Sequence, residues 1–335
     1  MMMTPGDIAR RRLLLGLTGL TCLAAATAGV VGWVRTNPRG RLDKSGPLFP
    51  RLGHELTSLS QIEIIWRGGG LVMRKTNTGW VAASRDSFPI NEAPLAQLIT
   101  SLKALRYRRA LTMPAEAQTP PLAPALGGDG IQLILRRSDG VLVDLTLAQR
   151  GGLMLAQIGA DPQLYQVSGP TWPDLGTPQT WLALDGFEIA PERIATASLT
   201  RLDQPALDIV RRPDGGFAPV GGKASPAATD VALLMARFAP VDVMAARRLS
   251  GPARLRHQTQ LKSGLMITLE AYVAQGQLWA VFRVDPRQAA TDQEARSLQA
   301  KTQGWAFALT SAQASLLETP TALILSAGAT PAASD

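Results

Sequence analysis

Few residues in this chain belong to the types that usually carry chemistry. There are two histidines, His54 and His257, and one cysteine, Cys22. Neither histidine has the E-x-x-H or H-x-E spacing of a metal site, and no G-x-S-x-G segment marks a nucleophilic serine. We therefore expect both histidines to be surface or linker residues. We also expect no catalytic residue, no cofactor and no metal, so the chain is predicted not to be an enzyme.

The acidic residues are scattered along the sequence. Asp144 lies in a predicted strand between apolar residues, and alternation predicts that it faces solvent. Asp185 and Glu188 lie in the connection between two predicted units. A hydrolase that uses paired carboxylates would need these acids, or a Ser-His pair, to converge in the fold. A hydrolase therefore remains an alternative function at this point.

One polar feature occurs twice. Arg106, Arg108 and Arg109 follow the first of two predicted helices, and Arg247 and Arg248 follow the second. Cations suit the C-terminal end of a helix, and charged side chains protect strand edges. The alternative is a basic contact rim for anionic headgroups or an acidic partner. These five arginines are therefore the candidate contact site.

The elements around these residues repeat. Five apolar positions of the first predicted helix return 136 residues later: Leu95, Leu98, Ile99, Leu102 and Leu105 match Val231, Leu234, Met235, Phe238 and Val241. The strand at Val72 returns at Ile209, and the hairpin at Val141 and Gly152 returns at Leu265 and Gly276, now 124 residues later. The shorter offset indicates a shorter loop after the second helix. The sequence predicts an α+β fold, a tandem duplication of an antiparallel β-meander with one packed helix per unit.

Strand and turn patterns give the organisation of the chain. We expect a basic tail at 1–12, a transmembrane signal anchor at 13–34 and a linker at 35–47. The first α+β unit is expected at 48–187, the second at 188–326 and a disordered tail at 327–335. Within the units, helices are predicted at Pro94–Leu105, with Asn91 as N-cap, and at Ala228–Phe238. A short insertion helix is predicted at Asp292–Lys301.

The N-terminal apolar segment suggests a membrane location. Leu13–Val34 contains 22 residues without a charge, and as a helix it would be about 33 Å long, enough to cross a bilayer. Ala26-Thr27-Ala28 also resembles a signal-peptidase site, and Arg10–Leu14 resembles a twin-arginine export signal. The uncleaved anchor is the favoured interpretation because the apolar run continues past the potential cleavage site.

The positive charge is concentrated near this segment. Residues 1–51 contain eight Lys or Arg and two acids, so six of the net +8 charges lie there. The remainder of the chain is nearly neutral. This distribution argues against nucleic-acid binding by the globular part.

Several short segments carry a resemblance to a known family: Leu48–Leu52, Ile62–Ile64, Gly79–Val81, Leu98–Leu105, Ile158-Gly159, Leu164–Val167 and Thr180–Leu182. Together with the anchor, they resemble an uncharacterised bacterial family of membrane-anchored periplasmic proteins, often encoded beside gliding-motility-type ABC transporter subunits. The resemblance covers about residues 48 to 200, and Arg106–Ala125 departs from the family pattern. It implies a location and a non-enzymatic role, and it supplies no catalytic residues.

These features predict a function at the cell envelope. We expect a single-pass inner-membrane protein with most of its chain in the periplasm, in contact with membrane lipid. It would be an accessory or scaffold protein that binds an envelope partner, such as ABC transporter subunits. The alternative is a module that binds a glycan or lipid in a cleft between the two units. The sequence does not identify the partner or any small-molecule ligand.

Overall fold

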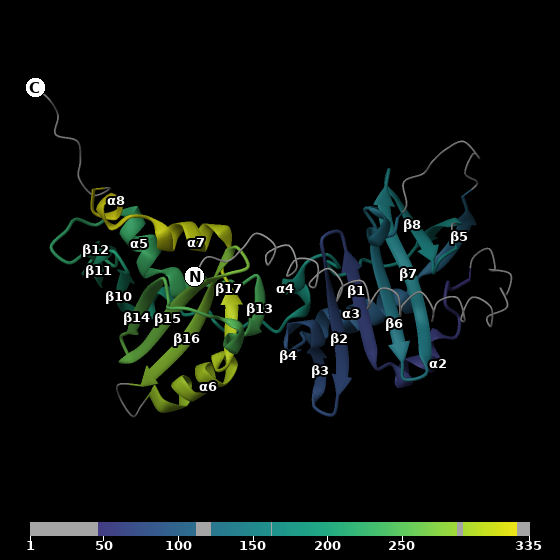
Figure 1. Cartoon of the computed structure of the whole chain (residues 1–335), viewed down its shortest axis with the longest axis horizontal. Helices are drawn as coiled ribbons and strands as arrows, with labels where there is room; N and C mark the ends of the chain where they lie inside the picture. The colour runs from purple at the N-terminus through teal and green to yellow at the C-terminus, as the bar shows by residue number, and fades with distance from the viewer. Residues whose placement is uncertain (1–45, 112–121, 162, 287–290, 327–335) are drawn as a thin grey trace, which may run out of the picture. The chain divides into compact units, whose positions relative to one another are not determined.

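The computed structural model describes residues 46–111, 122–161, 163–286 and 291–326 (Figure 1). The predicted basic tail 1–12, the membrane span 13–34, nearly all of the linker 35–47 and the tail 327–335 lie outside these ranges. No helix within the described ranges is long and apolar enough to cross a membrane.

The described residues form two compact units. The first comprises the residues up to Ser84 together with Pro89–Trp181. The second comprises Arg85–Phe88 and the chain from Leu182 onward. The predicted boundary after residue 187 therefore falls inside the second unit, and the short segment Arg85–Phe88 belongs to that unit although it lies far from it in sequence.

A nine-stranded antiparallel sheet forms the first unit, with the strand order β4-β3-β2-β1-β6-β7-β8-β9-β5 (Figure 1). The strands are β1 (Gln61–Trp66), β2 (Gly69–Thr76), β3 (Gly79–Ala82), β4 (Phe88–Pro89), β5 (Arg106–Ala110), β6 (Ile131–Arg137), β7 (Gly140–Arg150), β8 (Leu153–Ile158) and β9 (Leu164–Ser168). Helix α3 (Glu92–Ala104) starts at the predicted cap, where the Asn91 side chain accepts a hydrogen bond from the Ala93 amide. Its apolar stripe is buried, with Leu98 and Leu102 at 0% exposure.

The second unit contains an eight-stranded antiparallel sheet with the order β12-β11-β10-β14-β15-β16-β17-β13. The strands are β10 (Ile194–Arg201), β11 (Gln204–Arg211), β12 (Phe217–Pro219), β13 (Asp242–Ala245), β14 (Leu255–Leu261), β15 (Leu265–Ala274), β16 (Gln277–Pro286) and β17 (Trp305–Ala308). Helix α5 (Pro226–Ala232) begins with Ser225 as N-cap and Pro226 in its first turn.

The two sheets have the same strand order. When the two-residue strand β4 is set aside, each strand of the first sheet has a counterpart at the same place in the second, from β3 and β12 at one edge to β5 and β13 at the other. Neither sheet is a simple meander, because the chain crosses to the far edge after the helix. The predicted α+β class with two antiparallel sheets is confirmed.

The prediction of one helix per unit is wrong for the second unit. Besides α5, this unit contains α6 (Asp292–Thr302), α7 (Ser311–Glu318) and α8 (Thr321–Ser326). In the described part of the first unit, α3 is accompanied by the four-residue helices α2 (Leu52–Glu55) and α4 (Pro178–Trp181). The insertion helix predicted at 292–301 is present as α6. The second repeat helix is shorter than predicted, because the chain changes to a 3-10 turn at Leu234–Arg237.

The two cores differ at equivalent positions. In the first sheet, Leu133 on β6 pairs with Ile64 on one side and Leu145 on the other. In the second sheet, His257 on β14 pairs with Leu199 and Leu269 in the same register. Two residues further along, Leu135 is replaced by Thr259. All four side chains are buried, so the second unit holds polar groups where the first holds leucines.

Candidate functional site

The structure places three of the five predicted contact arginines on an edge strand. Arg106, Arg108 and Arg109 lie on β5, the last strand at one end of the first sheet, next to β9 (Figure 1). All three are exposed. The sequence placed them after a helix and missed the strand itself.

Two of these arginines are tethered by neutral groups. The Arg108 Nε donates to the Ser168 Oγ at 2.7 Å, and the Arg109 Nε donates to the Gln166 Oε1 at 2.8 Å. Within the described ranges, no carboxylate lies within 4.0 Å of either guanidinium. The two arginines therefore keep their charge facing solvent while their side chains are held in place.

The other two predicted arginines follow β13 in the second unit and are engaged by an acid. The Asp86 Oδ1 accepts a hydrogen bond from the Arg248 Nη2 at 2.6 Å, and the Arg247 Nη2 lies 3.6 Å away. The Asp86 Oδ2 accepts from the Ala245 amide at 3.0 Å. The Asp86 side chain is only 6% exposed. Arg248 is therefore an ion-pair partner of Asp86, whereas Arg108 and Arg109 have no carboxylate partner among the described residues.

The segment that carries Asp86 makes further contacts within the second unit. The Arg85 Nε lies 2.6 Å from the Asp242 Oδ1, and the Phe88 ring meets the Trp305 ring edge-on with centroids 4.9 Å apart. Asp86 and Ser87 have φ values of 56° and 68°, a left-handed conformation that is uncommon for residues other than glycine. The contacts of Arg85–Phe88 compensate for this strained backbone.

We expect Asp86→Ala to lower the free energy of unfolding of the second unit by about 1–3 kcal/mol, because the Ala245 amide and Arg248 lose a buried acceptor. Asp86→Asn keeps the size of the side chain and tolerates the left-handed backbone, so it isolates the loss of charge. Urea unfolding followed by circular dichroism measures both changes. Asp230→Ala is the matched control: its carboxylate pairs with Arg237 at the surface, 2.7 Å away, and less than about 1 kcal/mol should be lost. Equal losses in Asp86→Ala and the control would contradict the prediction.

His257 is not the surface residue that the sequence predicted. It is 0% exposed, and its Nε2 lies 2.9 Å from the Val231 carbonyl oxygen. Val231 is in the last turn of α5, where carbonyl groups lack the usual helical partners, and its oxygen also accepts a hydrogen bond from the amide of the C-cap residue Leu233. This contact requires a proton on Nε2, and the Nδ1 then has no hydrogen-bond partner among the described residues. Burial lowers the pKa of His257 to about 4. The other histidine, His54, is exposed as predicted.

Asp144 is also buried, contrary to the prediction that it faces solvent. It is 3% exposed and accepts a hydrogen bond from the Gln132 Nε2 at 2.8 Å. Burial raises its pKa. The alternation rule placed Asp144 on the face opposite Leu145, but β7 is buried on both faces along residues 141–147.

A buried arginine that the sequence did not reveal lies at the end of β10. Arg201 is 9% exposed. Its Nε donates to the Leu317 carbonyl oxygen at 2.8 Å, its Nη1 donates to the Thr321 Oγ1 at 2.9 Å, and its Nη2 donates to the Thr319 carbonyl oxygen. Burial lowers the pKa of the guanidinium. The cation thus binds carbonyl groups at the C-terminal end of α7, where the helix dipole is negative.

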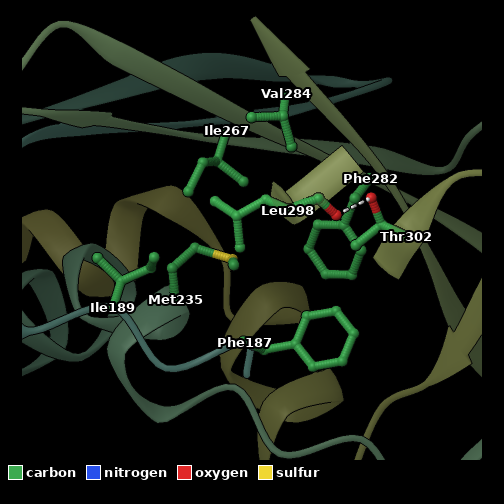
Figure 2. A pocket seen from close by; sticks show the side chains of 8 residues that line it. All are labelled: Phe187, Ile189, Met235, Ile267, Phe282, Val284, Leu298 and Thr302. Carbon is green, nitrogen blue, oxygen red and sulfur yellow. Dashed lines mark hydrogen bonds between the residues drawn. The ribbon is translucent and has the colours of Figure 1, made fainter. Parts of the chain in front are cut away.

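Two hollows occur in the second unit. One is an apolar gap under α6, shown in Figure 2, with a free volume for a water-sized molecule of about 10 Å³. It is lined by Phe187, Ile189, Met235, Ile267, Phe282, Val284, Leu298 and Thr302. Room for about one water molecule marks a packing gap in the core and not a ligand pocket. The other is an open hollow of about 360 Å³ beside Arg201, where Arg254 and Glu318 face each other at 3.5 Å.

Metal-ligating residues do not gather in the part of the chain that the structure describes: no group of three or more His, Cys, Asp or Glu side chains there has the arrangement of an ion site. In comparisons with known proteins, no protein-family model matches this chain, and no curated protein matches it. The candidate site is therefore defined by geometry alone. It is the arginine-bearing edge strand of the first unit.

Proposed function

We propose that this protein is a membrane-anchored accessory protein that faces the periplasm and binds another envelope component. The observation that carries this proposal is the exposed strip of arginines on β5, an edge strand of a large sheet. The predicted span at 13–34 supports the anchor, since it is long enough to cross a bilayer. The binding role is non-enzymatic.

We also propose that the two units arose by duplication of one sheet-and-helix module. The matching strand order supports this origin. The register match at Leu133 and His257 adds support, because the chain offset between these two positions is the same as between Val141 and Leu265. Duplicated modules that diverge can specialise, with one copy stabilised internally and the other free to bind.

The family resemblance suggests a partner. We propose that the chain belongs to the uncharacterised bacterial family found beside gliding-motility-type ABC transporter subunits, and that such subunits are the partner in the inner membrane. Co-expression with the ATPase and permease of a gliding-motility-type ABC transporter, followed by mild detergent extraction, tests the proposal. Co-purification of the permease supports it, and recovery of the chain alone contradicts it.

Location is tested separately. Because Cys22 is the only cysteine, a C22S chain accepts single reporter cysteines. Ser250 is exposed, and we expect Ser250→Cys to react with a membrane-impermeant maleimide once the outer membrane is permeabilised. Thr4→Cys in the same background should react only after the inner membrane is broken. Labelling of both positions only after lysis would contradict a periplasmic location.

A further inference from the structure

We propose that the exposed part of β5 binds an acidic segment of a partner protein, with Arg108 and Arg109 holding its carboxylates. This inference deepens the proposed accessory role by naming the chemistry of the partner. It rests on a surface within the first unit alone.

A β-bulge brings two consecutive arginines to one face of the sheet. The register between β5 and β9 shifts between Tyr107 and Arg109. Gln166 and Ser168 are two residues apart on β9 and so point to the same face, yet they receive hydrogen bonds from Arg109 and Arg108. In a regular strand, neighbouring side chains would point to opposite faces. The bulge turns one of the two arginine side chains to the face of the other, so this face carries two positive charges in place of one.

The tethers leave the binding ends of these side chains available. Each guanidinium is held through its Nε, and its two terminal nitrogens have no hydrogen-bond partner among the described residues. A fixed fork of N–H groups matches a carboxylate and forms short, charge-assisted hydrogen bonds. Because the neutral tethers already restrict the side chains, less entropy is lost when a ligand binds.

The edge of β5 is also incompletely paired. Among the described residues, Gly46 and Leu48 pair with its beginning, through the Tyr107 amide and the Leu105 carbonyl. Further along, the Ala110 amide bonds to the Tyr107 hydroxyl. The arginines therefore stand where an added chain segment would run along the sheet edge.

The second unit shows how an equivalent edge is occupied. Its counterpart strand, β13, receives the segment Arg85–Phe88, whose Asp86 carboxylate accepts from the Ala245 amide and from Arg248. In the second unit, an acidic residue on a separate chain segment thus already accepts hydrogen bonds from an edge strand and from an arginine. This internal precedent favours an acidic protein segment over a lipid headgroup as the occupant of β5.

The test is peptide binding by the full chain in detergent at low ionic strength. The probe is a short synthetic peptide of alternating Asp and Ser, and the control peptide has Asn in place of Asp. We expect the acidic peptide to bind the wild type and R108E/R109E to weaken binding by about tenfold or more. R67E/R74E is the matched control, with the same charge change at two exposed arginines of the first unit, and should bind like the wild type. Q166L/S168A keeps the arginines but removes their tethers, and should weaken binding a few-fold.

Each result has a defined meaning. Absence of peptide binding by the wild type overturns the inference, as does equal weakening in R108E/R109E and R67E/R74E, which reports only net charge. Binding to phosphatidylglycerol vesicles that requires Arg108 and Arg109, without peptide binding, also overturns it and assigns the surface to lipid. Circular dichroism confirms that each variant is folded. Peptide binding does not depend on location or transporter subunits, so this test and those of the proposed function fail independently.

Discussion

Lowering the pH from 6.5 to 4 is expected to cost the second unit about 3 kcal/mol of stability through His257 alone. The imidazole is fully buried, and burial lowers its pKa from 6.5 to about 4. In the unfolded chain it has the ordinary pKa. Between these two values the unfolded state takes up a proton that the folded state does not, so the free energy of unfolding falls as the pH falls. Below about pH 4 both states are protonated and the loss levels off.

His257→Leu is the natural comparison, because Leu occupies the equivalent position 133 in the first unit. This variant should lose the contribution of His257 to the pH dependence of stability between pH 6.5 and 4. It also removes the imidazole donor from the Val231 carbonyl, which keeps the Leu233 amide as a donor, so its stability at neutral pH reports the net effect of replacing the imidazole by leucine. Urea unfolding at a series of pH values measures both quantities. The difference between wild type and variant removes the contributions of other groups, including Asp144.

A direct measurement is available because the chain has only two histidines. In a His54→Gln chain, a single imidazole signal remains for NMR titration. We expect it to report a neutral ring with the proton on Nε2 down to about pH 4. A ring that titrates near 6.5 in the folded protein, or a His257→Leu variant with an unchanged pH profile, would contradict the burial argument.

Arg201→Met is expected to destabilise the C-terminal helices by about 3 kcal/mol. The guanidinium binds the Leu317 and Thr319 carbonyl oxygens and the Thr321 hydroxyl. These groups lie where α7 ends and α8 begins, and the carbonyls lack partners in the helix. Methionine fills similar space but donates nothing, so buried acceptors remain unsatisfied. Urea unfolding gives the free energy, and hydrogen exchange should show faster exchange in α7 and α8.

Two further variants sharpen this prediction. Arg201→Lys keeps the charge but presents it as a single point that cannot reach acceptors on three sides, so most of the loss should remain. Arg237→Met is the matched control, because the Arg237 side chain is 63% exposed and pairs with Asp230 at the surface, where such a pair contributes less than about 1 kcal/mol. A loss in Arg201→Met no larger than in the control would show that the carbonyl network is not stabilising.

The predicted elements were most accurate where local signals agree. Asn91 caps α3 as expected, and α6 lies where the insertion helix was predicted. Caps, turns and apolar periodicity act over a few neighbouring residues. The strands β5 and β13 were missed. β5 is short and rich in arginine, so it carries no apolar alternation.

The buried polar residues show the limit of local patterns. Around His257, the sequence Leu255-Arg-His-Gln-Thr-Gln-Leu261 does contain a usable signal, because alternation places His257 on the same face as two leucines. The neighbours of Asp144 in the sequence give no signal of its burial. Alternation predicted that Asp144 faces solvent, but β7 is buried on both sides there, and whether a face of a strand is covered depends on segments far away in the chain.

The sequence by itself determined the α+β class, the repeated order of elements and most of their positions, because hydrogen bonding and apolar burial repeat with the short periods of helices and strands. Only the tertiary structure decided the position of each strand in its sheet. It also decided that Arg85–Phe88 packs in the second unit, and that Arg108 and Arg109 lie on the same face of the first sheet. These features depend on contacts between residues distant in the chain, and on a single-residue bulge that shifts a side chain from one face to the other.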